Sequence, residues 1–399
     1  MLLNRERADR VMDEHGLAGI VASSALNVYY LTDWQTDGGW AFPGVNAAVV
    51  PRDHDTPAAV LTIDVDLDWP GAKEATWVAE VRGYGGMEAL VTRHSVALAS
   101  GELIGDPPDA GDRAFDPVAA VAGYLTEVGL ADARLAFEDA YFGARVRDAA
   151  RSDLDVVPAV DLLRTIRMVK TPSELAILRT ASRKNELAQL VAIEAIAAGA
   201  SFAEAQRVYF ASMLQMGGAG QYLTGVVSRP GIGPLDAPPT EPGDTVFFDS
   251  FGGYRHYCGD VGRTAVVGPP SDAQVATYHA LRQGWHETWQ RARPGMDSRE
   301  LAALVMRSVR DAGAAEYVIC SPHSVGLEHF DNPHPRSIYE PFVLEAGMVL
   351  SVDMPFMSSE VGMLHTEDLV LVGDDAVEFL TSNDDRLFVM ADGSVHRLS

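Results

Sequence analysis

Two aspartates interrupt a segment that otherwise has the composition of a β-hairpin. Residues 246–264, VFFDSFGGYRHYCGDVGRT, combine aromatic and β-branched residues and carry Asp249 and Asp260. Aspartate is depleted in strands and is rarely buried without a partner. In a hairpin with an even-numbered loop, positions whose numbers sum to an odd value share a face, so the two carboxylates share one. Such a pair repels unless a cation or a proton lies between the carboxylates.

The segment permits two loops. A tight turn at Gly252-Gly253 follows the usual preference of two-residue turns and would place Asp249 opposite His256. A wider loop centred on Tyr254-Arg255 would place Asp249 opposite Asp260, and a bound cation would favour it. The segment alone also allows a reading without chemistry, in which one aspartate is exposed and the other caps a turn.

Further titratable residues occur beside strand-like runs in the second half of the chain. The segment SPHSVGLEHFDNPHP (321–335) is a Gly/Pro-punctuated loop with three histidines, EAGMVLSVDMPF (345–356) contains Asp353, and HTEDLVLVG (365–373) contains Glu367. An oxygen-rich site with one imidazole suits Mn²⁺, Fe²⁺, Co²⁺ or Zn²⁺. Four carboxylates and one histidine could hold two such ions with a water or hydroxide between them.

The order of these motifs resembles the pita-bread metallohydrolases, the family of prolidase, Xaa-Pro aminopeptidase, methionine aminopeptidase and the metal-free creatinase. The resemblance covers nearly the whole chain, from SALNVYYLTDW (24–34) and RTIRMVKTPSELAILRTA (164–181) to PGDTVFFDSFG, YCGDVGRT, PHSVGL, EAGMVLSVDMP and TEDLVLV. It implies two bound divalent ions, with Mn²⁺ expected first and Co²⁺, Zn²⁺ or Fe²⁺ as alternatives. It implies that Asp260 and Glu367 bridge them, within the metal-ligand set Asp249, Asp260, His323, Asp353 and Glu367.

The chain departs from the family pattern at four points. Asp353 stands where the family usually has glutamate, and the loop 226–244 lacks the histidine of prolidase-like members, leaving Asp236 as the titratable group placed to substitute. His329 follows His323 by six residues instead of seven, and we assign it oxyanion or proton-transfer work. His365 occupies a position where prolidases often carry arginine, and we expect it to contact a carboxylate or the substrate.

The elements around these residues predict an α/β protein. A creatinase-type N-terminal α/β domain is expected over 1–160 and an α+β pita-bread catalytic domain over 161–399. Thr171, Pro172 and Glu174 form a capping box with proline at the first helical position, so a long helix is expected from about 172 to 198. Further helices are expected at 3–15, 115–130, 202–215, 271–292 and 298–313, and strands at 19–24, 47–51, 58–66 and 133–139.

The expected function is metal-dependent hydrolysis of an amide bond, of the Xaa-Pro dipeptidase or aminopeptidase type. The alternative is a creatinase-like or lyase-like enzyme that acts on a small molecule with one metal or none. The net charge of −25 disfavours nucleic acid and anionic membranes as partners, which leaves a small-molecule or short-peptide substrate. Two cysteines and no signal-peptide pattern predict a cytoplasmic protein. The resemblance implies a homodimer, and the loop DWQTDGGWAFPG (33–44) is expected near the substrate.

Overall fold

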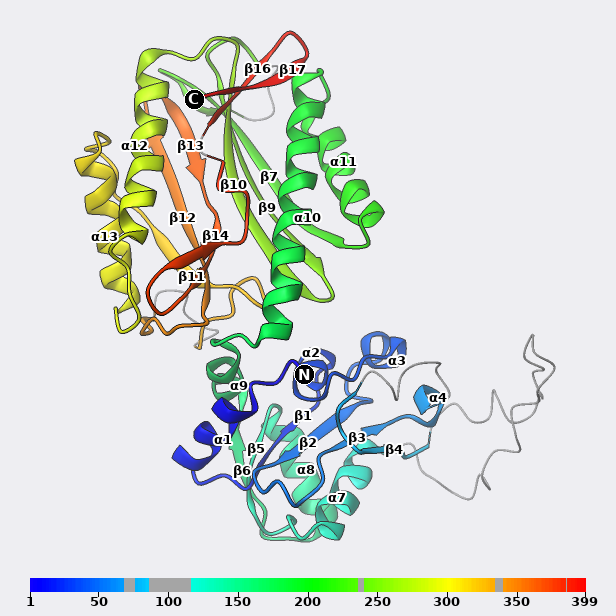
Figure 1. Cartoon of the computed structure of the whole chain (residues 1–399). Helices are drawn as coiled ribbons and strands as arrows, with labels where there is room; N and C mark the ends of the chain where they lie inside the picture. Colours follow the sequence, from blue (N-terminus) through cyan, green and yellow to red (C-terminus); the bar gives the residue numbers. More distant parts are fainter. Residues whose placement is uncertain (68–75, 86–115, 236–239, 334–339, 385) are drawn as a thin grey trace, which may run out of the picture. The chain divides into compact units, whose positions relative to one another are not determined.

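A six-stranded mixed sheet organises the N-terminal part of the chain. The computed structural model describes residues 1–67, 76–85, 116–235, 240–333, 340–384 and 386–399, and these divide into two units, Met1–Ile166 and Arg167–Ser399 (Figure 1). The strand order in the first unit is β4-β3-β2-β1-β5-β6, with β1, β5 and β6 parallel. The strands are β1 Gly19–Ala22, β2 Ala47–Pro51, β3 Ala59–Thr62, β4 Glu80–Gly83, β5 Arg134–Phe137 and β6 Asp155–Pro158.

Helices and strands alternate in this unit, as the sequence predicts for an α/β domain. Its helices are α1 Arg5–Glu14, α2 Ala25–Thr32, α3 Asp37–Ala41, α4 Asp64–Leu67, α7 Pro117–Glu127, α8 Ala140–Ala150 and α9 Val160–Arg167, which reaches the boundary with the second unit. The segment expected as a recognition loop contains the short helix α3, and Trp34 is only 1% exposed. Trp34 is therefore an interior residue of this unit.

In the second unit, the described residues form two sheets and four helices. The first sheet has the order β17-β16-β10-β9-β7-β8, and the second has β11-β12-β14-β15 with β13 paired to β12. The first comprises β7 Ala219–Arg229, β8 Gly233–Leu235, β9 Thr245–Tyr254, β10 Tyr257–Val267, β16 Leu387–Ala391 and β17 Ser394–Leu398. The second comprises β11 Ser321–Ser324, β12 Val349–Ser358, β13 Gly362–Thr366, β14 Leu369–Val372 and β15 Val377–Phe379.

The four helices flank these sheets in two pairs. Helices α10 Pro172–Ala197 and α11 Phe202–Gln215 pack against β7, β9 and β10, whereas α12 Asp272–Trp289 and α13 Ser298–Asp311 pack together beside the second sheet (Figure 1). Helix α10 begins with the predicted capping box, in which the Thr171 hydroxyl accepts from the Glu174 amide and the Glu174 carboxylate accepts from the Thr171 amide. Within the described residues, no helix is both long and apolar enough to cross a bilayer.

The hairpin that carries the two aspartates turns at neither expected position. Tyr254 pairs with Tyr257, so Arg255 and His256 form the two-residue turn, with φ values of 47° and 68°. Two consecutive positive φ angles are those of a type I′ turn, whose twist matches that of the flanking strands. Both the Gly252-Gly253 turn and the loop centred on Tyr254-Arg255 are therefore wrong.

Candidate metal centre

Strands β9 and β10 place two carboxylates on one face, as their parity predicts. In the observed register Asp249 lies opposite Gly262, and Asp260 lies opposite Phe251. Asp260 is thus two residues along β10 from the partner of Asp249, so the carboxylates are diagonal neighbours instead of directly opposed. Asp260 is fully buried. The diagonal offset removes the direct opposition but leaves two carboxylates close together in the interior.

The second sheet meets this hairpin at Glu367. The backbone amide of Gly262 donates to the Glu367 carbonyl (3.1 Å), and the Glu367 amide donates to the Gly262 carbonyl (3.2 Å), which joins the two sheets. On β12, Met354 pairs with Thr366 of β13, a register that sets Asp353 across from Glu367. His323 on β11 pairs with Ser351 of β12, whose hydroxyl donates to Glu367 Oε1 at 2.7 Å. Strands β9, β10, β11 and β12 and the segment at Glu367 thus meet at the junction of the two sheets.

The five expected metal ligands lie in one cluster, and three of them lie close to His323. Its Nε2 lies 3.6 Å from Asp260 Oδ2, 3.7 Å from Asp353 Oδ2 and 3.9 Å from Glu367 Oε1. Three overlapping groups have ligand atoms within 4.8 Å of one another: Asp249, Asp260 and Glu367; His323, Asp353 and Glu367; and Asp260, His323 and His329. Asp260, His323 and Glu367 each belong to two of these groups, and of the three only the two carboxylates have a second oxygen with which to bridge two ions.

The chemistry of these side chains fits divalent cations. Among the described residues, Asp260 Oδ1, His323 Nε2 and Glu367 Oε2 are buried and have no hydrogen-bond partner. Buried polar atoms are nearly always hydrogen-bonded, so three unpartnered ones in a single cluster call for a missing partner. An ion with ligands at about 2.1 Å holds them roughly 3.0–3.5 Å apart, close to the separations around His323 Nε2. The residues therefore fit the metal ions that the family resemblance implies.

The electrostatics of the metal-free cluster agree with this fit. Burial raises the pKa of Asp249 to about 7. Burial, followed by the charges of Asp260 and Asp353, raises the pKa of Glu367 well above its ordinary value. Burial also lowers the pKa of His323 and favours its neutral, metal-binding form. The metal-free protein thus opposes full ionisation of its own carboxylates, and a cation would relieve that cost.

His329 joins this cluster although its spacing differs from the family pattern. Its Nε2 lies 3.1 Å from Asp260 Oδ2, and its ring stacks on Phe251 with centroids 4.0 Å apart. Burial alone would lower the pKa of His329, but the Asp260 carboxylate outweighs burial and raises it. The side chain is 23% exposed, so the imidazole is partly open to solvent beside the carboxylates.

His365 lies on the other side of Asp353 and Glu367. Its Nε2 is 3.4 Å from Asp353 Oδ1 and 3.8 Å from Glu367 Oε2, and its ring stacks on Phe247. Burial would lower the pKa of His365, but the carboxylates of Asp353 and Asp249 raise it. For Asp353 burial would raise the pKa, but His365 and His323 lower it. His365 Nε2 therefore lies beside two of the expected metal ligands.

Asp236 and His334 lie outside the described residues. Cys258 is 2% exposed, and its Sγ lies 3.7 Å from Gln221 Oε1, so it is a small buried thiol. Burial raises the pKa of this thiol, so it is a poor nucleophile or metal ligand near neutral pH.

The sequence did not indicate the residues that support the cluster. Phe247 and Phe251 flank Asp249 on its own face of β9, and each stacks on one imidazole. The signal that could have found them is the period-two alternation of a strand, which puts residues 247, 249 and 251 on one face.

A second group of supporting residues anchors the histidine-bearing loop. Arg167 donates to Asp331 Oδ1 through both Nε (3.1 Å) and Nη2 (2.6 Å), and the Asp331 amide donates to the Ser324 carbonyl. The Ser324 amide in turn donates to the side chain of Asn332 (2.7 Å). The contacts between Arg167 and Asp331 join residues 164 positions apart, and no local pattern reveals them.

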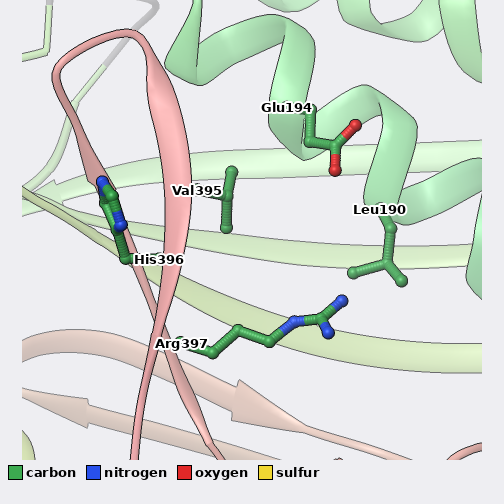
Figure 2. Close-up of a pocket in the computed structure, with 5 residues that line it drawn as sticks. All are labelled: Leu190, Glu194, Val395, His396 and Arg397. Atoms are coloured by element: carbon green, nitrogen blue, oxygen red, sulfur yellow. The ribbon is translucent and has the colours of Figure 1, made fainter.

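A surface pocket lies between α10 and β17, and it is separate from the metal centre. Leu190 and Glu194 of α10 line it together with Val395, His396 and Arg397 of β17 (Figure 2). None of these five residues belongs to the carboxylate–histidine cluster. We therefore place the chemistry at the junction of the two sheets.

The fold and the cluster define a two-domain metallohydrolase, and comparisons with known proteins agree. Residues 176–374 match metallopeptidase family M24, and residues 4–169 match the creatinase/prolidase N-terminal domain. The chain belongs to this family of hydrolases, with the creatinase-type domain preceding the pita-bread catalytic domain.

Individual proteins resemble the chain in sequence or in fold. The chain is 29% identical to an Xaa-Pro dipeptidase of Pyrococcus furiosus over 235 residues, which are 57% of this chain and 67% of that protein. It is similar in fold to an X-Pro aminopeptidase from Thermotoga maritima, with a TM-score of 0.73, 18% identity and coverage of 95% and 99% of the two chains. An Xaa-Pro dipeptidase from Bacillus anthracis gives a TM-score of 0.70, 21% identity and coverage of 96% and 98%.

Proposed function

We propose that the chain hydrolyses the Xaa-Pro bond of short peptides with two divalent ions, Mn²⁺ being the first choice and Co²⁺, Zn²⁺ or Fe²⁺ the alternatives. The observation that carries the proposal is the cluster of ligand-type side chains around His323 Nε2, in which, among the described residues, Asp260 Oδ1, His323 Nε2 and Glu367 Oε2 are buried without a hydrogen-bond partner. Membership of family M24 and the Xaa-Pro dipeptidase of Pyrococcus furiosus support the peptide substrate. The proposed ligands are Asp249, Asp260, His323, Asp353 and Glu367.

The bound ions would supply an activated water at neutral pH and polarise the amide carbonyl. The protein's own residues prepare this chemistry. Ser351 donates to Glu367 and fixes the orientation of that carboxylate. His329, partly exposed and hydrogen-bonded to Asp260, is placed to hold a proton and deliver it to the leaving nitrogen.

Two further residues complete the proposed site. His365 holds Asp353 in place from the side opposite His323. Asp236 keeps its proposed role beside the substrate, because the loop 226–244 contains no histidine to bind it. Creatinase-like or lyase-like chemistry is not favoured, since the relatives carry peptidase names.

We also propose that the protein is a cytoplasmic homodimer. The two cysteines are free, and Cys258 is buried, which agrees with a reducing compartment. The homodimer rests on the family resemblance, and light scattering coupled to size-exclusion chromatography tests it.

The decisive experiment combines metal content with substrate choice. The protein is loaded with Mn²⁺, dialysed and analysed for bound metal, next to Asp260→Asn. We expect two ions per chain in the wild type, fewer in the variant, and cleavage of an Xaa-Pro dipeptide but not of the matched Xaa-Ala dipeptide. A wild-type protein that holds two ions but leaves Xaa-Pro dipeptides intact refutes the substrate, and one that holds no ion refutes the metal centre.

A further inference from the structure

The ring of His365 occupies a space that is shaped to hold it in one orientation. Phe247 stacks on the imidazole with centroids 4.3 Å apart and planes 10° apart. Gly262 lies against its edge, where an added Cβ would be 2.3 Å from both Cε1 and Nδ1. The His365 amide donates to the Thr264 hydroxyl at 2.6 Å, which fixes the backbone. The imidazole of His365 is 1% exposed and is confined by Phe247 and Gly262, so each of its ring nitrogens points in a defined direction.

The hydrogen bond at Nδ1 determines what Nε2 can do. Nδ1 lies 3.1 Å from the backbone carbonyl of Phe248, and a carbonyl oxygen only accepts, so Nδ1 carries a hydrogen. In the neutral imidazole this places the lone pair on Nε2. A histidine that binds a metal through one nitrogen usually donates from the other to a carbonyl or carboxylate. His365 has that arrangement.

The two carboxylates beside His365 divide their oxygens between two imidazoles. His323 Nε2 faces Asp353 Oδ2 and Glu367 Oε1, whereas His365 Nε2 faces Asp353 Oδ1 and Glu367 Oε2. The distances from His365, 3.4 and 3.8 Å, exceed the roughly 2.7–2.9 Å of a charge-assisted hydrogen bond. In the described part of the chain, His365 Nε2 and Glu367 Oε2 both lack a hydrogen-bond partner while being buried.

We propose that His365 is a sixth protein ligand of the metal centre, coordinating through Nε2 on the side of Asp353 and Glu367. The assignment rests on the metal centre proposed above and adds a second imidazole to it. Imidazole suits Zn²⁺, Co²⁺ and Fe²⁺ better than Mn²⁺, whereas carboxylates suit Mn²⁺. The ion beside His365 is therefore held by a softer donor set than the five original ligands provide, which favours Zn²⁺, Co²⁺ or Fe²⁺ at that position.

The test observes the ring nitrogen directly in the unmodified protein. The full chain is prepared with isotopically labelled histidine and loaded with a spin-active isotope of Cd²⁺ as the probe. His365→Gln identifies the His365 signal by its absence. We expect the Nε2 resonance of His365 to be split by scalar coupling to cadmium, while that of His279 on α12, outside the centre, remains unsplit. If His365→Gln does not fold, His365→Asn, whose amide can still donate to the Phe248 carbonyl, provides the assignment.

The outcomes separate this assignment from the proposed function. Bound cadmium with an unsplit His365 resonance overturns the assignment without affecting the metal centre. Failure of the wild type to bind any ion overturns the proposed function itself. As a second readout, His365→Gln should weaken Zn²⁺ binding by about 10–100-fold or more in a chelator competition. Mn²⁺ binding should be weakened less, and an equal loss for both ions contradicts the softer donor set.

Discussion

Two clusters of buried charged residues lie on opposite faces of the strands at the junction of the two sheets. Only one of them contains arginines whose positive charges balance its carboxylates. The front cluster consists of Asp249, Asp260 and Glu367, and among the described residues Asp260 Oδ1 and Glu367 Oε2 are buried without a hydrogen-bond partner. Behind them, Arg263 donates to Asp368 (2.7 Å) and to Glu186 (2.9 Å), and Arg282 donates to Asp368 (2.8 Å); this group is the rear cluster.

The adjacent residues Glu367 and Asp368 belong to different clusters, because successive side chains of an extended chain point to opposite faces. Glu367 faces the front and Asp368 the rear. The rear cluster contains its own countercharges, whereas the front cluster needs cations from outside. The comparison separates buried charge that serves structure from buried charge that serves binding.

The largest effect is expected at the rear cluster. Asp368→Asn leaves two buried guanidinium groups without their shared carboxylate and should reduce the free energy of unfolding by about 3–5 kcal/mol. Glu378→Gln is the matched control, because it breaks the exposed pair with Arg179 and should cost no more than about 1 kcal/mol. Urea unfolding of the metal-free proteins measures both. Equal losses in the two variants would show that the rear cluster is not a structural element.

Substitution in the front cluster should reduce activity and leave stability intact, in contrast to substitution in the rear cluster. Asp249→Asn should reduce hydrolysis of an Xaa-Pro dipeptide by roughly 10²–10³-fold, the cost typical of losing one electrostatic contribution to catalysis. The same change should leave the metal-free protein as stable as the wild type or more so, because it removes a buried carboxylate from its neighbours. Steady-state kinetics and urea unfolding give the two values. Strong destabilisation of the metal-free variant would contradict the distinction between the clusters.

Metal removal should affect the front cluster alone. At a free concentration a hundredfold above Kd, an ion that binds only the folded state stabilises it by about 2.7 kcal/mol, which a chelator would abolish. Asp368→Asn should retain this increment on top of its lower stability, whereas Asp260→Asn should lose most of it. Thermal unfolding with and without chelator measures the increments. An unchanged increment in Asp260→Asn would exclude Asp260 as a ligand.

A smaller effect is expected where the histidine loop is anchored. Arg167→Lys loses the paired donation to Asp331 and should weaken metal binding by about 10–100-fold, the range for residues that orient ligands. Arg179→Lys, in an exposed pair, is the control and should leave binding unchanged. Chelator competition measures both affinities. Wild-type affinity in Arg167→Lys would show that the loop is positioned without this contact.

The stability of the metal-free protein should depend on pH through two opposing contributions, one from Asp249 and one from Asp368. The folded-state pKa of Asp249 is raised from 3.8 to about 7, so its contribution to stability is complete below pH 3.8 and is lost as pH rises through about 7. For Asp368, burial would raise the pKa, but Arg263 and Arg282 lower it below 3.8. Its contribution is present above pH 3.8 and is lost as pH falls through the folded-state pKa.

Variants resolve the two pH contributions. Asp249→Asn should flatten the decline in stability between about pH 4 and 7 in metal-free protein, because the raised pKa of Asp249 produces part of it. Asp368→Asn should instead remove stability gained above pH 3.8. Urea unfolding across this range measures both curves. A decline that persists unchanged in Asp249→Asn would assign it to other groups.

The sequence was sufficient to predict that Asp249 and Asp260 share a face, because strand parity does not depend on which even loop is used. It was not sufficient for the register, since the turn uses Arg255 and His256 at positive φ in place of the adjacent glycines. Non-glycine residues seldom adopt that conformation, and pairing with β7 and β10 along the whole of β9 outweighs the local preference. The rear cluster was beyond prediction because Arg263, Arg282 and Asp368 meet only after the sheets pack.

The backbone bridge between Gly262 and Glu367 has a consequence for how the protein assembles. The five proposed ligands span residues 249 to 367, and before this bridge forms, β9 and β10 offer an ion only two carboxylates. Closing such a distant contact is a slow, entropically costly step. The polypeptide should therefore acquire its overall architecture first and capture metal last. In refolding experiments the ion would accelerate only the final phase, because it binds after the two sheets have paired.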